Sequence, residues 1–246
     1  MPKKKNIKDK IFTFIKEKKL LSILILLAFI LIFAAGIYSN IQKNKKIEAI
    51  SKLEDNPVIG ETSINYQTKN DIILGNQNAP ITIIEYASLS CPHCANFYNN
   101  VFAQIKEKYI DKGKVKFIYR DFPLNQSAML ASIVSLCNAR NNNNDSNKYY
   151  KFIKTLFKNQ NNWAFSNDFF DKLRSLAKLN GMTDKEFDVC VNNQKLVEEI
   201  LQNRLKAAND LKINSTPSFI MNGKLIGGYR NFRDFSRIID TELKKF

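Results

Sequence analysis

Two of the four cysteines of the sequence, with two residues between them, form the tetrapeptide Cys91-Pro92-His93-Cys94. This spacing lets Cys91 and Cys94 close a disulfide within one helical turn. The tetrapeptide follows a predicted strand and opens a predicted helix, whose N-terminus offers unpaired N–H groups and about half a positive charge. Such a position lowers the pKa of a thiol below its usual value of about 8.5 and favours the thiolate. We expect redox chemistry, with Cys91 as the exposed reactive sulfur and Cys94 as the resolving one.

Pro92 and His93 are assigned to the same catalytic motif. His93 is the only histidine of the chain and can add a hydrogen-bond donor or a positive charge beside the Cys91 sulfur. A single histidine excludes sites that need two, and a Ser/His/Asp hydrolase could be built only around His93. A Cys-X-X-Cys pair can also be half of a zinc site, but zinc usually takes four ligands. We therefore predict no metal and no cofactor.

The elements around the motif form a strand, a helix and a second strand. Residues Ile81 to Tyr86 are a nearly continuous apolar run, typical of a strand that is covered on both faces. An amphipathic helix is expected from Ser90 or Cys91 to just before Gly113. Val115 to Tyr119 is a second buried strand, and the three elements make a right-handed crossover unit.

Downstream of this unit the sequence is largely helical and then returns to strands. Residues 127 to about 212 are expected to be helical, with Thr183 and Glu186 forming a capping box. A β-hairpin with its turn at Asn222-Gly223 follows, and a helix over Asn231 to Lys245 closes the chain. The expected helical core includes the aromatic series Tyr149, Tyr150, Phe152 and Phe157.

With these motifs, the chain resembles the DsbA-like thiol:disulfide oxidoreductases of the thioredoxin superfamily. The resemblance covers roughly Asp71 to Phe246 and lies in two segments, ILGNQNAPITIIEYASLSCPHC and STPSFIMNGKLIGGY. It implies an α/β, thioredoxin-like fold with the helical stretch as an insertion. Thr216-Pro217 would be the cis-proline loop that packs against the cysteine pair and contacts substrate, although Pro217 could also be an ordinary trans proline.

The resemblance also suggests roles for an acid and for the other two cysteines. Glu85 matches the buried acid that accepts the proton of the resolving cysteine, although it could be a partly exposed strand residue without such a role. Arg120 could pair with Glu85 or be an exposed charge. Some relatives carry a second disulfide, and four cysteines divide most simply into a catalytic and a structural pair. Cys137 and Cys190 are the structural candidates, with two buried, inert thiols as the alternative.

The N-terminal part predicts a membrane segment. Residues 1–19 are a basic segment, residues 20–40 an apolar transmembrane anchor or long signal sequence, and residues 41–69 a polar tether to the domain at residues 70–246. The excess of lysine before the apolar run places the N-terminus in the cytoplasm and the domain outside it. The domain would then lie in a periplasm-like space, on a single-pass inner-membrane protein or on a cleaved, secreted one.

The net charge of +15 does not require a nucleic-acid partner. Residues 1–55 hold 12 lysines and 5 acidic residues, and the remaining 191 residues carry only +8. We expect an enzyme that donates its disulfide to thiols of client proteins and is reoxidised by a DsbB-like membrane partner, as the resemblance implies. Thr216 before the proline keeps an isomerase or reductase open. A non-enzymatic metal-binding or protein-binding module is the remaining alternative.

Overall fold

The computed structural model of the protein describes residues 35–38, 68 and 70–246. Residues 35–38 are helical. The predicted basic segment, most of the apolar segment and nearly all of the tether lie outside the described residues. Within the described residues, no helix is both long and apolar enough to cross a bilayer.

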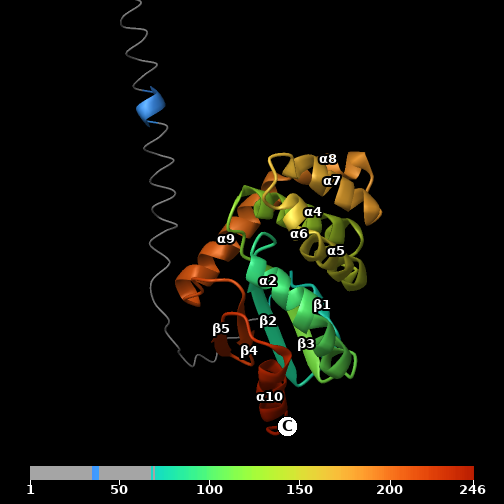
Figure 1. The fold of residues 1–246 in the computed structure, drawn as a ribbon, viewed down its shortest axis with the longest axis vertical. Helices are drawn as coiled ribbons and strands as arrows, with labels where there is room; N and C mark the ends of the chain where they lie inside the picture. The colour runs from blue at the N-terminus through green and yellow to red at the C-terminus, as the bar shows by residue number, and fades with distance from the viewer. Residues whose placement is uncertain (1–34, 39–67, 69) are drawn as a thin grey trace, which may run out of the picture. The chain divides into compact units, whose positions relative to one another are not determined.

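A five-stranded mixed sheet forms the centre of the domain, in the order β1-β3-β2-β4-β5 (Figure 1). The strands are β1 (Ile73–Leu74), β2 (Ile81–Ala87), β3 (Val115–Asp121), β4 (Ser218–Met221) and β5 (Lys224–Gly227). The central strand β2 pairs in parallel with β3 and antiparallel with β4. Its side chains are buried on both faces, as the apolar sequence predicted.

The helix after β2 begins at Pro92, with Cys91 at its N-cap, but it is not a regular α-helix throughout. It runs through α2 (Pro92–Phe97), the π-helical segment η1 (Tyr98–Phe102), α3 (Ala103–Ile105) and the π-helical segment η2 (Lys106–Ile110). The predicted amphipathic face is buried along its length, with Phe97, Val101, Ile105 and Tyr109 in the core. The expected span is therefore confirmed, whereas the π-helical turns were not predicted.

Six helices make up the insertion between β3 and β4. They are α4 (Gln126–Asn141), α5 (Ser146–Lys158), α6 (Gln160–Trp163), α7 (Phe169–Leu179), α8 (Asp184–Val191) and α9 (Gln194–Asp210). The capping box at the start of α8 is formed by Thr183 and Glu186 in both directions. The expected aromatic residues of α5 are buried, and they attach the insertion to the sheet.

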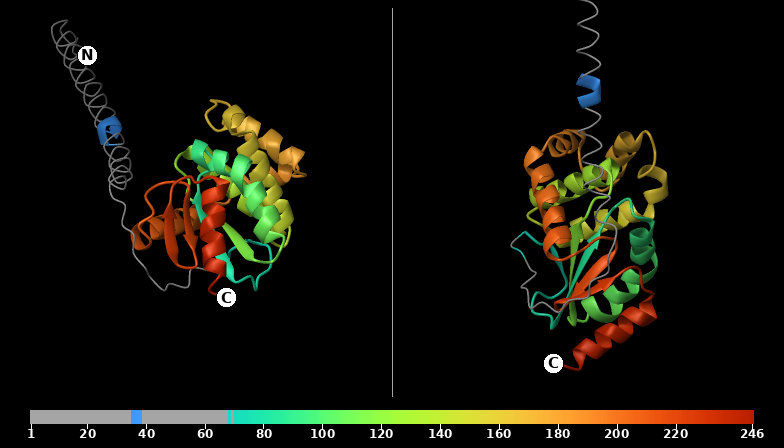
Figure 2. Two further views of the ribbon diagram at one scale, coloured as in Figure 1. Left: turned by 60° about the horizontal axis from the view of Figure 1, so that its bottom comes forward. Right: turned by 90° about the vertical axis from the view of Figure 1, so that its left-hand side faces the viewer.

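The hairpin β4–β5 turns at Asn222 and Gly223, both with positive φ, as two-residue hairpins require. Helix α10 (Phe232–Leu243) follows, and Figure 2 shows it lying along the sheet. Phe97 of α2, Phe219 of β4 and Phe235 of α10 meet with ring centroids 4.7–5.4 Å apart. This aromatic cluster covers the face of the sheet that carries Glu85, because Glu85 and Phe219 are opposite each other in register.

Candidate active site

The two cysteines of the motif lie where β2 passes into α2. Cys91 is the N-cap residue, with extended backbone, and Pro92 occupies the first helical position. The thiols of Cys91 and Cys94 are not bridged, and both residues are buried, Cys94 completely. Pro92 and His93 are exposed to solvent. The motif therefore faces the surface, with its second sulfur turned into the protein.

The surroundings of Cys91 stabilise its thiolate. A hydrogen bond from the Cys94 thiol, with smaller contributions from Thr216 and the backbone N–H groups of Cys94 and His93, lowers the pKa of Cys91 to about 5. Partial burial opposes this shift but does not cancel it. His93 contributes through its backbone N–H here, while its imidazole is exposed.

Cys94 and Glu85 have the opposite tendency. Burial, followed by the hydrogen bond to Cys91 and the negative charges of Glu85 and Cys91, raises the pKa of Cys94 well above its ordinary value. Burial and then the negative charge of Cys91 raise the pKa of Glu85. Glu85 has no solvent exposure, and neither carboxyl oxygen has a hydrogen-bond partner among the described residues. An acid in such a site is favoured in its neutral form and can give a proton to a neighbouring sulfur.

Arg120 does not neutralise Glu85, and neither sequence expectation for it was correct. Its guanidinium binds both carboxyl oxygens of Asp71 at 2.7 and 2.9 Å, and it donates to the Tyr86 hydroxyl at 2.6 Å. Tyr86 and Arg120 are opposite each other in register and lie one residue on from the pair Glu85 and Tyr119. Successive side chains in a strand point to opposite faces, so Arg120 lies on the face away from Glu85.

The loop before β4 reaches Cys91 from the other end of the sequence. The peptide bond between Thr216 and Pro217 is cis, and the Cys91 sulfur lies 3.3 Å from the Thr216 carbonyl oxygen. The Thr216 hydroxyl is buried and makes no other hydrogen bond in the described part of the chain, so it is available to donate to the Cys91 thiolate. The structure thus places Thr216 and Pro217 beside the cysteine pair.

Gln160 is a residue of this site that the sequence analysis missed. Its side-chain amide donates to the carbonyls of Leu89 and Cys91, at 2.9 and 3.0 Å, and the residue is buried. It lies on α6, so it ties the helical insertion to the segment that carries Cys91. Nothing in its local sequence distinguishes it from the neighbouring polar residues of that helix.

Comparisons with known proteins agree with this geometry. The family described as Thioredoxin matches residues 67–241. A putative protein-disulfide oxidoreductase of Rickettsia felis is 31% identical over 79% of this chain and 68% of its own length. This chain belongs to the thioredoxin family. It is a DsbA-like protein-disulfide oxidoreductase.

Solved structures support the same assignment for this DsbA-like protein. The crystal structure of Wolbachia pipientis alpha-DsbA1 has a TM-score of 0.69 and 34% identity, covering 75% of this chain and 97% of that one. Oxidised BdbD from Bacillus subtilis has a TM-score of 0.64 and 25% identity, covering 77% and 100%. The thioredoxin-like fold with a helical insertion is thus shared with DsbA proteins.

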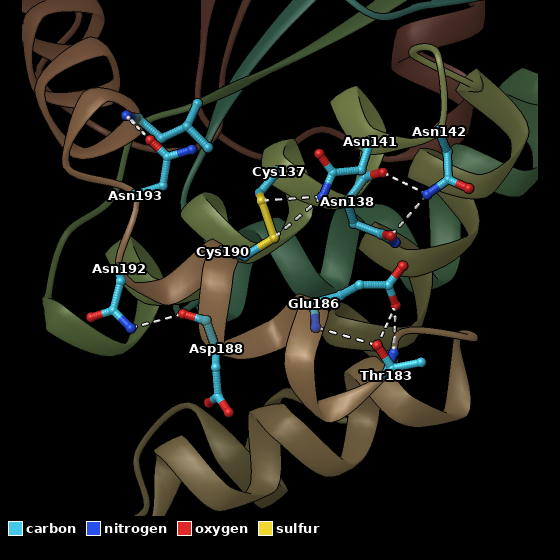
Figure 3. The surroundings of a disulfide bond; sticks show 11 residues. Cys137, Asn138, Asn141, Asn142, Thr183, Glu186, Asp188, Cys190, Asn192 and Asn193 are labelled. Carbon is cyan, nitrogen blue, oxygen red and sulfur yellow. Dashed lines mark hydrogen bonds between the residues drawn. A yellow bond between two sulfur atoms is a disulfide. The ribbon is translucent and has the colours of Figure 1, made fainter.

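The two remaining cysteines of this DsbA-like protein are joined to each other. The sulfur atoms of Cys137 on α4 and Cys190 on α8 are bonded, and the Cα atoms are 5.5 Å apart (Figure 3). The side-chain amide of Asn141 lies 3.8 and 4.0 Å from the two sulfurs. Both cysteines are buried within the insertion. The bond therefore links two helices of the insertion and is separate from Cys91 and Cys94.

Proposed function

We propose that this DsbA-like protein introduces disulfides into proteins that have crossed a membrane, with Cys91 and Cys94 as the redox pair. The observation that carries the proposal is the difference between the two sulfurs. The pKa of Cys91 is lowered to about 5, while that of Cys94 is raised by burial. A disulfide whose outward sulfur leaves as a stable thiolate is easily reduced by a client, and so it acts as an oxidant.

The reaction begins when a client thiolate attacks the Cys91 sulfur of the oxidised pair. The Cys91–Cys94 bond breaks, a client–Cys91 mixed disulfide forms, and Cys94 leaves as a thiolate. A second client thiolate then attacks the client sulfur of the mixed disulfide. The client disulfide forms, Cys91 leaves as its stabilised thiolate, and the pair has gained two electrons.

Glu85 serves the inner sulfur in this scheme. The thiolate of Cys94 is disfavoured by burial, so it must take up a proton as it leaves. Glu85 is close enough to interact electrostatically with both cysteines, and burial favours its neutral form. It can protonate Cys94 during client oxidation and remove the same proton when the pair is reoxidised.

The loop of Thr216 and Pro217 is assigned to client binding. It lies directly beside the Cys91 sulfur and precedes β4, so a client cysteine that reacts with Cys91 must approach it. Thr216 also donates toward the Cys91 thiolate, which links the residue before the proline to the stability of the reduced pair.

The compartment and the reoxidising partner belong to the same proposal. The apolar segment at residues 20–40 would anchor the chain in the inner membrane, or direct its secretion if cleaved, and the domain would lie in the periplasm. A DsbB-like membrane protein would return the pair to its disulfide form. A reporter active only outside the cytoplasm, fused after Phe246, should be active, and the protein should stay in the membrane pellet. A shortened soluble species would indicate cleavage, and an inactive reporter would reject the topology.

The redox potential of the Cys91–Cys94 pair separates an oxidase from an isomerase or reductase. The alternative rests on the identity of Thr216, because threonine before this proline also occurs in isomerases of the superfamily that the chain resembles. Equilibration of the full-length protein with glutathione buffers should give an oxidising potential, above that of the glutathione pool. Rapid oxidation of a reduced peptide with two cysteines, together with slow insulin reduction, would support the oxidase. A reducing potential with rapid insulin reduction would reject it.

A further inference from the structure

Glu85 lies in a row with two other residues along the carboxyl ends of the parallel strands. Tyr119 is opposite Glu85 in register, and Asp121 is opposite Ala87. Residues directly opposite each other, or two apart in one strand, share a face of the sheet. Glu85, Tyr119 and Asp121 therefore lie on the same face, with Tyr119 between the two acids, and all three are buried.

Tyr119 lies within electrostatic range of both acids and of Cys94. Its hydroxyl donates to the carbonyl of Ala87 at 3.4 Å, and Ala87 is the residue opposite Asp121. The charges of Asp121, Cys94 and Glu85 each raise the pKa of Tyr119, after the larger effect of burial. Tyr119 is thus a neutral phenol, able both to donate and to accept, between the acid of the redox site and a second acid.

Asp121 connects this row to a cavity that reaches the solvent. The cavity has a volume of about 260 Å³, and Tyr119, Asp121 and Tyr149 line it. Its rim carries the exposed residues Lys206 and Asp210 of α9. Tyr149 is one of the lining residues, and its buried hydroxyl has no hydrogen-bond partner among the described residues.

The other charges around Asp121 are largely paired among themselves. In the cavity wall, Arg120 binds Asp71, and Arg140 binds both carboxyl oxygens of Glu199.

From α4, the Ser132 hydroxyl donates to the Asp121 carboxylate, and from α9, the Arg204 guanidinium lies over the Phe122 ring. Burial raises the pKa of Asp121 to about 7, and the hydrogen bond from Ser132 opposes this rise. Asp121 can therefore gain and lose a proton near neutral pH.

We propose that Tyr119 and Asp121 form the proton exit of the redox site. Tyr119 passes the proton of Glu85 toward Asp121, and Asp121 exchanges it with water in the cavity. Glu85 has no exposed surface and no hydrogen-bond partner in the described part of the chain, so it needs such a route to reach the solvent. Tyr119 and Asp121 do not take part in the disulfide exchange themselves; they carry the proton that Glu85 exchanges with Cys94. The inference rests on the proposed function, in which Glu85 exchanges a proton with Cys94.

The proposal can be tested on disulfide closure, the step that depends on this proton. The reduced full-length protein is mixed with oxidised glutathione, which first forms a mixed disulfide with Cys91. Cys94 then gives its proton to Glu85, attacks the Cys91 sulfur and displaces glutathione as a thiolate. Rapid acid quenching, alkylation and mass spectrometry follow the two steps separately across pH.

In the unaltered protein we expect closure to accelerate as the pH rises through about 7, because Asp121 must be ionised to accept the proton. Asp121→Asn and Tyr119→Phe should remove this rise and slow closure about tenfold, less than the roughly hundredfold effect of a proton-transfer group at the reacting atoms. Ser132→Ala should move the rise to higher pH, because it removes a hydrogen bond that favours ionised Asp121. This shift would not follow from a purely structural role.

Formation of the mixed disulfide is the internal control. The rate of this step depends on the Cys91 thiolate and should be the same in all three variants as in the unaltered protein. Absence of this first step in the unaltered protein would reject the proposed function itself. If the first step is normal and none of the three variants changes how the rate of disulfide closure depends on pH, only the proton exit would be overturned. If Asp121→Asn does not fold, the direction of the Ser132→Ala shift still decides the question.

Discussion

The side-chain amide of Gln160 donates to the backbone carbonyl of Cys91, with 3.0 Å between nitrogen and oxygen. The same amide reaches the carbonyl of Leu89 at 2.9 Å. One side chain of the helical insertion therefore holds both ends of the short segment that leads into the active-site helix. The insertion in this way helps to position the segment that leads to Cys91.

Removing this contact should loosen the active-site segment. Gln160→Ala leaves the Leu89 carbonyl without its partner, which should lower the free energy of unfolding by about 1–3 kcal/mol. Chemical denaturation of the reduced protein measures the change. Gln194→Ala is a matched control, because Gln194 is exposed on α9 and its loss should change stability by about 0.5 kcal/mol or less. Equal effects of the two substitutions would contradict a role for Gln160.

The different roles of the two active-site sulfurs can be separated by substitution. Cys94→Ser leaves Cys91 able to attack but removes the resolving thiol, so mixed disulfides with client proteins should accumulate on non-reducing gels. Cys91→Ser should abolish disulfide exchange altogether. Oxidase activity retained in Cys91→Ser, together with a Cys94→Ser protein that traps no client, would show that the roles are assigned the wrong way round.

The lowered pKa of Cys91 predicts how the redox potential depends on pH. Between pH 5 and the raised pKa of Cys94, reduction takes up one proton for two electrons, so the potential should fall by about 30 mV per pH unit. Below pH 5 two protons are taken up, and the slope should be about 59 mV.

The lowered pKa of Cys91 also makes the stability of the folded, reduced protein depend on pH. The thiolate stabilises the folded, reduced protein above the pKa of an unfolded cysteine, and this contribution declines as the pH falls toward 5. Ultraviolet absorbance of the thiolate should give a midpoint at the pH where the slope of the potential changes. A single slope of about 59 mV through neutral pH would contradict the assignment.

His93 should favour the Cys91 thiolate in two ways, and one of them can be removed alone. His93→Ala keeps the backbone N–H that lowers the pKa of Cys91 but removes the imidazole. We expect the pKa of Cys91 to rise and the protein to become less oxidising. Asn96→Ala is the control, because Asn96 is exposed further along α2. An unchanged thiolate titration in His93→Ala would restrict the role of this residue to its backbone.

Local sequence patterns predicted the elements of the fold but not the contacts between them. The apolar run of β2 and the capping box at Thr183 and Glu186 depend on neighbouring residues, and both are present. Arg120 binds Asp71, 49 residues earlier, a contact that no local pattern indicates. The contact of Gln160 with Cys91 likewise spans 69 residues and depends on how the insertion folds back.

The bond between Cys137 and Cys190 should contribute stability without taking part in exchange. It closes a segment with a sequence separation of 53, for which the chain-entropy treatment gives a stabilisation of about 4 kcal/mol. The double variant Cys137→Ala/Cys190→Ala should therefore unfold at lower denaturant, while its Cys91–Cys94 pair keeps its redox potential. The unaltered protein, isolated without reductant and denatured, should show no titratable thiol from Cys137 or Cys190. Unchanged stability of the double variant, or an altered potential of the redox pair, would contradict a purely structural bond.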